Sequence, residues 1–338
     1  PLDAQMEMSS EWSEGVRKQE VWLSGLLPYE NATEVLERIG QVGISKSSVW
    51  RQAQSSGAQI HAFEEKERAE AMILPGKWEV MPIEDAEKRM GAAMDGGMIF
   101  IMEEGWKELK VGSVFEVGAR QGLDERSGEP ANIPTAMSMS YVAHLGGTKK
   151  FGTLLWSEAR RRKWWGVRGT EVVGDGAAWI WNQCALHFGE SIQVVDWYHA
   201  KEHLVAAAHS IHGEGTPAMR QWLKTHEQWL YQGHARKIAD HLLDLAQTYP
   251  DAAKSLAAEA GYFMKHHRRM QYMRLREDGW AIGSGMVESG IKQYKDRFCG
   301  AGMRWSREGA ENLIPIRTAI LSGRFDQRWE QVRNLPPN

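Results

Sequence analysis

The sequence predicts an α/β protein whose sheet-forming region is interrupted by a helical insertion. Three features of the 338-residue chain support this prediction. Apolar residues recur with helical spacing before residue 90, and short apolar or alternating runs typical of strands lie between residues 91 and 197. Residues 199–270 return to helical spacing with almost no strand signal. A chain of this length is large enough to form more than one domain.

The amino-terminal region has the outline of a helix-turn-helix. A first helix is predicted in "NATEVLERIG" (31–40), and a second in "SKSSVWRQAQ" (45–54), where Ser45 is a natural N-cap. In such a motif the start of the second helix faces the major groove of DNA. The residues expected there are Lys46, Ser47, Ser48 and Arg51. An ordinary helical hairpin fits the same outline equally well.

Strand and helix signals alternate through the middle of the chain. Strands are predicted at 91–103, 107–118, 139–145, 171–175 and 191–197. A Gly/Pro/Asn-rich loop is predicted at 118–136. Helices are predicted at 151–165 and 177–188, and two more, at 285–298 and 306–322, follow the insertion.

This order of elements matches a ribonuclease-H-like core with an all-helical insertion after the fifth strand, plus a helical N-terminal region. It predicts four parts of the chain. They are a DNA-binding region (1–89), the first part of the catalytic core (90–198), a helical insertion (199–280) and C-terminal helices that complete the core (281–330).

Composition narrows the class of protein. No apolar run approaches the roughly 20 residues that span a bilayer, so we expect no membrane association and a cytoplasmic, nucleoid-associated protein. The two cysteines, Cys184 and Cys299, exclude a disulfide framework and a thiolate zinc ribbon within these residues. The chain begins with Pro1, which favours a sequence shortened at its start.

The net charge of −3 argues mildly against a nucleic-acid binder, but two runs are locally basic. These are "ARRRKWWGVR" (159–168) and "MKHHRRMQYMRLR" (264–276). Each fits either a DNA-binding surface or a solvated helix face. The sixteen tryptophans likewise fit either base stacking beside cations or core packing.

Three acidic residues occupy informative positions. Asp95 lies in the first predicted strand, Asp175 at the end of the fourth, and Glu288 in the first turn of the helix after the insertion. In this topology the first and fourth strands are neighbours and the helix packs across them, so we expect the three carboxylates to converge. Taken singly, Asp175 could be a helix cap and Glu288 a residue that complements the helix dipole.

Converging carboxylates are hard oxygen ligands that suit Mg²⁺ or Mn²⁺. Two such ions can stabilise the attacking and leaving oxygens in phosphoryl transfer. The glycines beside Asp95, Gly96 and Gly97, leave space for a phosphate backbone to approach. The acids therefore predict a two-metal nuclease site.

A competing pattern lies in "VVDWYHAKEHL" (194–204). His199 to His203 reads H-x-x-E-H, a motif of one class of zinc peptidases, in which two histidines on one helix face bind zinc. The sequence offers no obvious third ligand, so the pattern gives little support for a zinc metallopeptidase.

Three segments resemble the ISKra-type family of bacterial insertion-sequence transposases, which are DDE enzymes with a ribonuclease-H-like catalytic domain. The segments are "MDGGMIFIMEEGWKELKVGSVFEV", "VVGDGAAWIWNQCALHFGESIQVVDWYHAKEHL" and "IGSGMVESGIKQ…GMRWSREGAENLIPIRTAILSGRFDQRW". The resemblance covers residues 20–330 and implies DNA cleavage and strand transfer at the ends of a mobile element.

By motif position, the resemblance implies that Asp95, Asp175 and Glu288 are catalytic and bind two Mg²⁺ (or Mn²⁺) ions. It places Asp196, His199 and His203 next to the metal site. We expect the substrates to be double-stranded DNA, namely terminal inverted repeats and target DNA. A homo-oligomer is expected because two DNA ends have to be paired. The candidates for DNA phosphate contacts are Arg268, Arg269, Lys292, Lys295, Arg297 and Arg304. The main alternative is a catalytically inactive, DNA-binding transposase relic.

Overall fold

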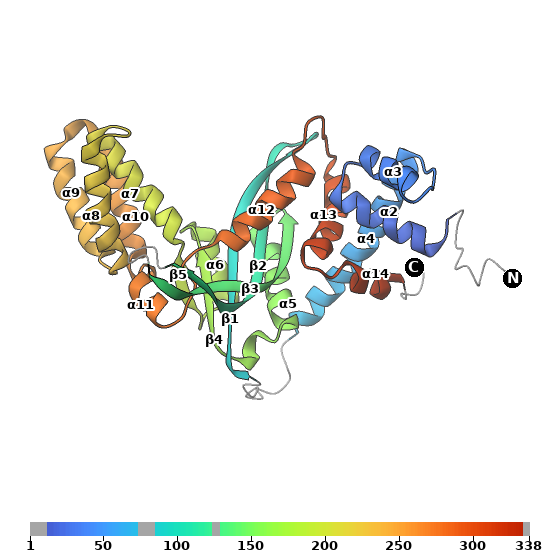
Figure 1. The fold of residues 1–338 in the computed structure, drawn as a ribbon, viewed down its shortest axis with the longest axis horizontal. Coiled ribbons are helices and arrows are strands. Elements are labelled where there is room, and N and C mark those ends of the chain that lie inside the picture. The colour runs from blue at the N-terminus through green and yellow to red at the C-terminus, as the bar shows by residue number, and fades with distance from the viewer. Residues whose placement is uncertain (1–11, 74–84, 124–128, 334–338) are drawn as a thin grey trace.

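A five-stranded mixed sheet lies at the centre of the molecule (Figure 1). The computed structural model describes residues 12–73, 85–123 and 129–333. The strand order is β3-β2-β1-β4-β5. β1, β2 and β3 pair in antiparallel fashion, and β4 and β5 add in parallel beyond β1. The strands are β1 (Asp85–Ile101), β2 (Gly105–Leu123), β3 (Pro130–Leu145), β4 (Val167–Gly174) and β5 (Ile192–Val195). The predicted α/β class and the five strands are thereby confirmed.

The loop predicted at 118–136 is wrong for the residues described there. Val117 pairs with Ala136, and the pairing continues to Leu123 opposite Pro130, so β2 and β3 extend as a two-stranded ribbon beyond the sheet. A ribbon exposed on both faces lacks the apolar alternation that identifies a strand. Pro134 gave a further turn signal, but it lies in the edge strand β3, where a missing N–H is tolerated.

Helices cover both faces of the sheet. The space beside the Cα of Gly97 in β1 is filled by Ile291 of α12 (Gly285–Phe298), whereas that beside Gly112 in β2 is filled by Phe151 and Leu155 of α5 (Thr148–Arg161). The two glycines therefore mark opposite faces. The other helices of the core are α6 (Ala178–His187), α13 (Arg307–Leu321) and α14 (Phe325–Arg333).

The amino-terminal helices are α2 (Glu14–Leu26), α3 (Tyr29–Arg38) and α4 (Lys46–Ala71). Ser45 caps α4 as predicted, because its hydroxyl accepts a hydrogen bond from Ser48 N–H at 3.2 Å. α4 continues far beyond the predicted end at residue 54 and packs against α13. Gly57 permits this approach, since a Cβ at that position would overlap the backbone of Asn312.

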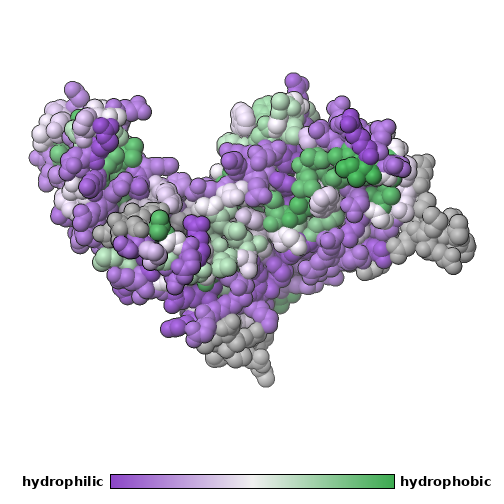
Figure 2. Space-filling view, in the orientation of Figure 1, coloured by the Kyte–Doolittle hydropathy of each residue, from purple (hydrophilic) through white to green (hydrophobic). Residues whose placement is uncertain are grey.

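The insertion is helical throughout. It consists of α7 (Trp197–His212), α8 (Pro217–Tyr231), α9 (Ala235–Thr248), α10 (Ala253–His266) and α11 (Tyr272–Glu277), with short 3-10 turns between some of them. It stands apart from the rest of the molecule, with a concave outline between them (Figure 2). Across the described residues, every helix is too short or too polar to cross a bilayer.

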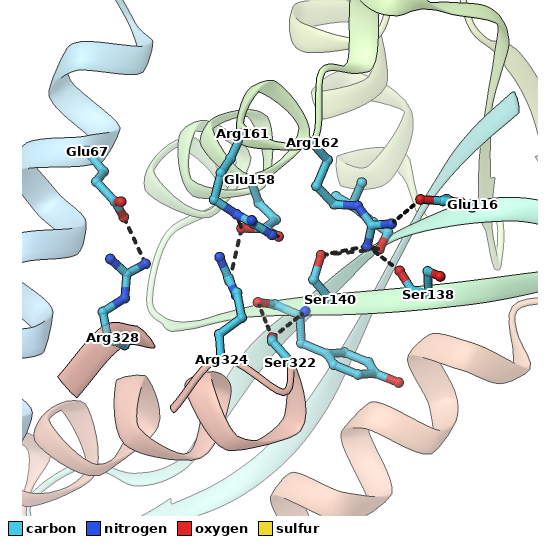
Figure 3. A network of polar contacts seen from close by, with 12 residues as sticks. Glu67, Glu116, Ser138, Ser140, Glu158, Arg161, Arg162, Ser322, Arg324 and Arg328 are labelled. Atoms are coloured by element: carbon cyan, nitrogen blue, oxygen red, sulfur yellow. Dashed lines mark hydrogen bonds and ion pairs between the residues drawn. The ribbon is translucent and has the colours of Figure 1, made fainter. Parts of the chain in front are cut away.

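The basic run at the end of α5 forms part of an ion-pair network (Figure 3). The buried carboxylate of Glu158 accepts from Arg161 at 2.5 Å and pairs with Arg324 at 3.0 Å. Burial alone would raise the pKa of Glu158, but the two arginines hold it below its ordinary value. Arg162 pairs with Glu116 of β2 at 3.4 Å. These arginines join α5 to the sheet and to the carboxyl-terminal region, so this part of the basic run has a structural role.

Candidate active site

Asp95 lies in the middle of β1, paired with Val111 of β2. Its side chain points to the face of the sheet that α12 covers, because Asp95 precedes Gly97 by two residues. The carboxylate is half-buried, and its Oδ1 accepts a hydrogen bond from Gly96 N–H at 2.6 Å. The sequence suggested that Gly97 leaves space for a phosphate, but this prediction is wrong. A Cβ at Gly97 would lie 2.8 Å from Ile291 Cγ2, so α12 already fills this space.

Asp175 follows the last residue of β4 directly. Its Oδ1 accepts from Ala177 N–H at 2.7 Å, which fixes the turn into α6. Its backbone carbonyl accepts from the Tyr262 hydroxyl of α10 at 2.8 Å. The insertion therefore holds the strand end that carries Asp175. Tyr262 was not expected from the sequence, since nothing local connects residues 87 apart.

Glu288 lies in the first turn of α12, with 46% of its side chain exposed. Its Oε1 accepts from the Ser284 hydroxyl at 2.9 Å. Ser284 is buried and four residues earlier, so it orients the carboxylate from the segment that enters the helix. The "GSGMVE" pattern contained this signal, since a serine at a helix start commonly bonds nearby groups.

The three acids lie within electrostatic reach of one another. Burial, together with the negative charges of Asp175 and Glu288, raises the pKa of Asp95 to about 6, although the Gly96 hydrogen bond and His199 act in the opposite direction. Like charges in a partly desolvated site repel and favour protonation. Residues 95, 175 and 288 therefore form one acidic cluster, although 80 and 113 residues separate them in sequence.

His199 and Asp196 lie beside this cluster. His199 Nδ1 is 3.1 Å from Asp196 Oδ1 and 4.0 Å from Glu288 Oε1. The hydrogen bond to Asp196 raises the pKa of His199 to about 9. Burial would raise the pKa of Asp196, but hydrogen bonds from His199 and from the Ser284 backbone lower it. The protonated His199 ring therefore places a positive charge next to Glu288.

Among the described residues, one group brings three potential metal ligands close together. Asp196, His199 and Glu288 bring potential ligand atoms within 4.8 Å of one another. Both oxygens of Asp196 already accept hydrogen bonds from His199 and Ser284, and its side chain is fully buried. We therefore assign Asp196 an orienting role. The ligand atoms of Asp95, Asp175 and Glu288 do not all lie within 4.8 Å of one another. Each of these carboxylates nevertheless has hydrogen bonds to only one oxygen among the described residues, so each keeps an oxygen that a hard divalent cation could bind.

His203 does not join His199 as a ligand pair. Its Nδ1 contacts Glu259 Oε2 at 2.5 Å, and its ring stacks on Tyr262 with centroids 3.5 Å apart. Both partners belong to α10, so His203 fixes α7 against α10. The H-x-x-E-H pattern is thus divided between two environments, and this geometry does not assemble a zinc peptidase site.

The expected DNA-contacting residues occupy several different surfaces. Six of them are exposed. Lys46 and Arg51 lie at the start of α4, Lys292 and Lys295 in α12, Arg268 in the turn after α10, and Arg304 in the segment after α12. Ser48 is half-buried and its hydroxyl accepts from Arg51 at 3.2 Å. Arg269 is half-buried, stacks over Trp181 and donates to Gln193 at 2.7 Å.

Arg297 is not available for a phosphate contact. Its side chain is buried, its Nε donates to the carbonyl of Ser24 at 2.8 Å, and its guanidinium lies over the rings of Tyr29 and Trp305. The sequence placed it correctly in a basic helix. Helical periodicity alone did not reveal that α2 and α3 cover this turn of α12.

Comparison with known proteins gives a short similarity. No family model matches the chain. A segment of 88 residues is 32% identical to a protein described as "UPF0236 protein in vanSb 3'region" from Streptococcus gallolyticus. The match covers 25% of this chain and 20% of that protein. The chain is therefore similar to that protein over a limited part of both.

Proposed function

We propose that this protein is a DDE transposase that cleaves DNA at the ends of an insertion sequence and transfers the strands to target DNA. The observation that carries the proposal is the placement of three acids: Asp95 in β1, Asp175 directly after the neighbouring strand β4, and Glu288 in the first turn of α12, which packs on β1. A cluster of this kind, on a mixed α/β sheet and without a thiolate, suits phosphodiester chemistry with Mg²⁺ or Mn²⁺. The ISKra-type resemblance points to the same reaction, and a ribonuclease-H-like core is compatible with the strand order.

The residues of the site have separable roles in this proposal. Asp95, Asp175 and Glu288 would hold the cations, which when bound supply an activated water and stabilise charge on the phosphate oxygens. Ser284 orients Glu288, and Asp196 orients His199. The exposure of Glu288 leaves the cluster open to a large substrate.

Positive side chains near the cluster would bind the DNA backbone. Lys292 and Lys295 lie one and two turns after Glu288 on α12, and both are exposed. Lys46 and Arg51 at the exposed start of α4 would contact DNA farther from the cleavage site. Double-stranded DNA is the proposed substrate, and two copies of the chain would pair the two element ends.

The test is cleavage of labelled DNA that carries the genomic sequences flanking the gene. The wild-type protein should cleave in Mg²⁺ and not in EDTA, and Asp175→Asn should remain folded but inactive. Asp244→Asn, on the exposed surface of α9, is a matched control that should cleave as wild type does. Full cleavage by Asp175→Asn contradicts the proposed site. Specific binding without any cleavage by the wild type supports the inactive relic instead.

A further inference from the structure

A large groove separates the β2–β3 ribbon from the helical insertion. Its volume is about 1480 Å³. One wall is the ribbon, at residues 120–123 and 131–136, and the other is the start of α7 together with α8. Residues 281–283, Gly285, Met286 and Ser289 also line it, so the groove reaches the first turn of α12, where Glu288 lies. In Figure 1 the distal ribbon runs toward α11 at the base of the insertion.

One face of α8 forms much of the second wall. Arg220, Lys224, Gln228 and Tyr231 line the groove at intervals of three or four residues, which is the spacing of a single helix face. Thr216 caps the helix and Pro217 begins it, so Arg220 lies near a firmly defined helix start. Arg220 and Lys224 are exposed, and neither forms an ion pair with a described residue.

The charged side chains that line the groove are mainly positive. Among its described lining residues five are Lys or Arg and two are Glu. One of the two, Glu227, is paired with Lys201 at 3.3 Å. The positive side chains come from the ribbon, α7, α8 and α11, and they are Arg120, Lys201, Arg220, Lys224 and Arg276. This distribution complements a polyanion.

Aromatic and apolar side chains lie among these cations. Tyr198 is 52% exposed, and its ring lies beside Gly283, where an added Cβ would be 3.4 Å away. Tyr198 immediately precedes His199 in α7, so the aromatic surface begins next to the acidic cluster. Leu123 and Met139 are also exposed within the groove. Cations combined with aromatic planes suit unpaired nucleic acid, because only unpaired bases present their faces for stacking.

We propose that this groove binds an unpaired DNA strand that extends from the catalytic acids. The inference rests on the proposed function, since it identifies the path of one strand of the proposed substrate. Arg220 and Lys224 contact its phosphates, and Tyr198 stacks on a base close to the cleavage site. The ribbon closes the groove on the opposite side, where Arg276 donates to the carbonyl of Pro134 at 3.4 Å and so holds the ribbon against the insertion.

The experiment measures binding of a fluorescein-labelled single strand of about 15 nucleotides, the upper range of site sizes for such grooves, by anisotropy in EDTA so that no cleavage occurs. The double variant Arg220→Glu/Lys224→Glu should bind at least about tenfold more weakly than wild type. The slope of log K against log salt, which is negative, should become shallower by about 1.4. Each phosphate that is no longer neutralised reduces the magnitude of the slope by about 0.7. Tyr198→Ala should weaken binding about fivefold or more without changing that slope.

The matched control is Arg236→Glu/Lys254→Glu. It reverses two exposed charges on α9 and α10 that do not line the groove, and it should bind within twofold of wild type. Circular dichroism melting of all variants checks folding. Binding of the groove variants within twofold of wild type overturns the inference, as does equally strong competition by a duplex of the same sequence. The binding assay needs no metal, so the two proposals can fail separately. Absence of cleavage by the wild-type protein would contradict the proposed function, but it would not change the strand binding measured here.

Discussion

Asp196 accepts a hydrogen bond from the backbone N–H of Ser284, although 88 residues of chain separate them. Trp197 N–H donates to the carbonyl of Ile282 at 2.9 Å in the same place. The two ends of the insertion are thus joined directly beside the acidic cluster. The insertion therefore positions Glu288, because Ser284 in turn donates to its carboxylate.

Asp196→Asn tests this connection. Asp196 accepts from His199 with one carboxylate oxygen and from Ser284 with the other, whereas an amide has only one oxygen. One of the two hydrogen bonds is therefore lost, and the start of α12 should be held less firmly. We expect the cleavage rate to fall about 10- to 100-fold, as for other residues that orient metal ligands. We expect the free energy of unfolding to fall by about 1–3 kcal/mol. Single-turnover cleavage and urea unfolding measure the two effects, and wild-type values of both would refute the positioning role.

Gly97→Ala tests the close packing of α12 on β1. The new methyl group would lie 2.8 Å from Ile291 Cγ2, so α12 has to move away from Asp95. We expect a loss of about 1–3 kcal/mol in unfolding free energy and reduced cleavage. Gly261→Ala is the control, because that glycine is exposed within α10 and has open space around its Cα. Similar effects of the two substitutions would contradict the packing argument.

Glu158→Gln tests the network of Figure 3. The substitution leaves the guanidinium groups of Arg161 and Arg324 without their shared buried carboxylate. Breaking a buried ion pair from one side costs about 3–5 kcal/mol, so the melting temperature should fall clearly. Glu330→Gln breaks an exposed pair with Arg333 at 3.6 Å and should change stability by less than about 1 kcal/mol. Calorimetry that finds equal shifts would show that the network contributes little.

His226 gives the insertion a sensitivity to acid. It is buried, its Nδ1 donates to the carbonyl of Trp222 at 2.8 Å, and burial lowers its pKa to about 4. A depressed pKa means that the stability contributed by the neutral ring is complete above pH 6.5 and is lost as the pH falls through about 4. The loss should reach at most about 3 kcal/mol. Urea unfolding at about pH 7 and about pH 4.5, on either side of the ordinary histidine pKa, measures this loss. The difference in unfolding free energy between the two pH values should be smaller in His226→Leu than in wild type. An equal difference would contradict the assignment.

Much of the fold could be predicted from the sequence because its core strands are strongly patterned. Val172 and Val173, for example, are fully buried in a short apolar run that is typical of a central strand. The β2–β3 ribbon and the length of α4 could not be predicted in this way. Both depend on tertiary contacts, such as that between Gly57 and Asn312, which leave no periodic signal.

The candidate site was predictable for a similar reason. Asp95 lies in β1 and Asp175 directly follows β4, the strand that pairs with β1, so topology alone brings them near each other. The partners that orient the site were harder to foresee. Tyr262 reaches Asp175 from within the insertion, and Arg297 turns inward because the amino-terminal helices cover it. Neither arrangement follows from local spacing.

The most direct test of the acidic cluster is Mn²⁺ binding, measured by isothermal titration calorimetry on the wild type and on Asp95→Asn, Asp175→Asn and Glu288→Gln. If the three carboxylates share one metal site, each substitution should weaken Mn²⁺ binding about tenfold or more, while Asp244→Asn leaves it unchanged. Wild-type affinity in any of the three variants would contradict the account.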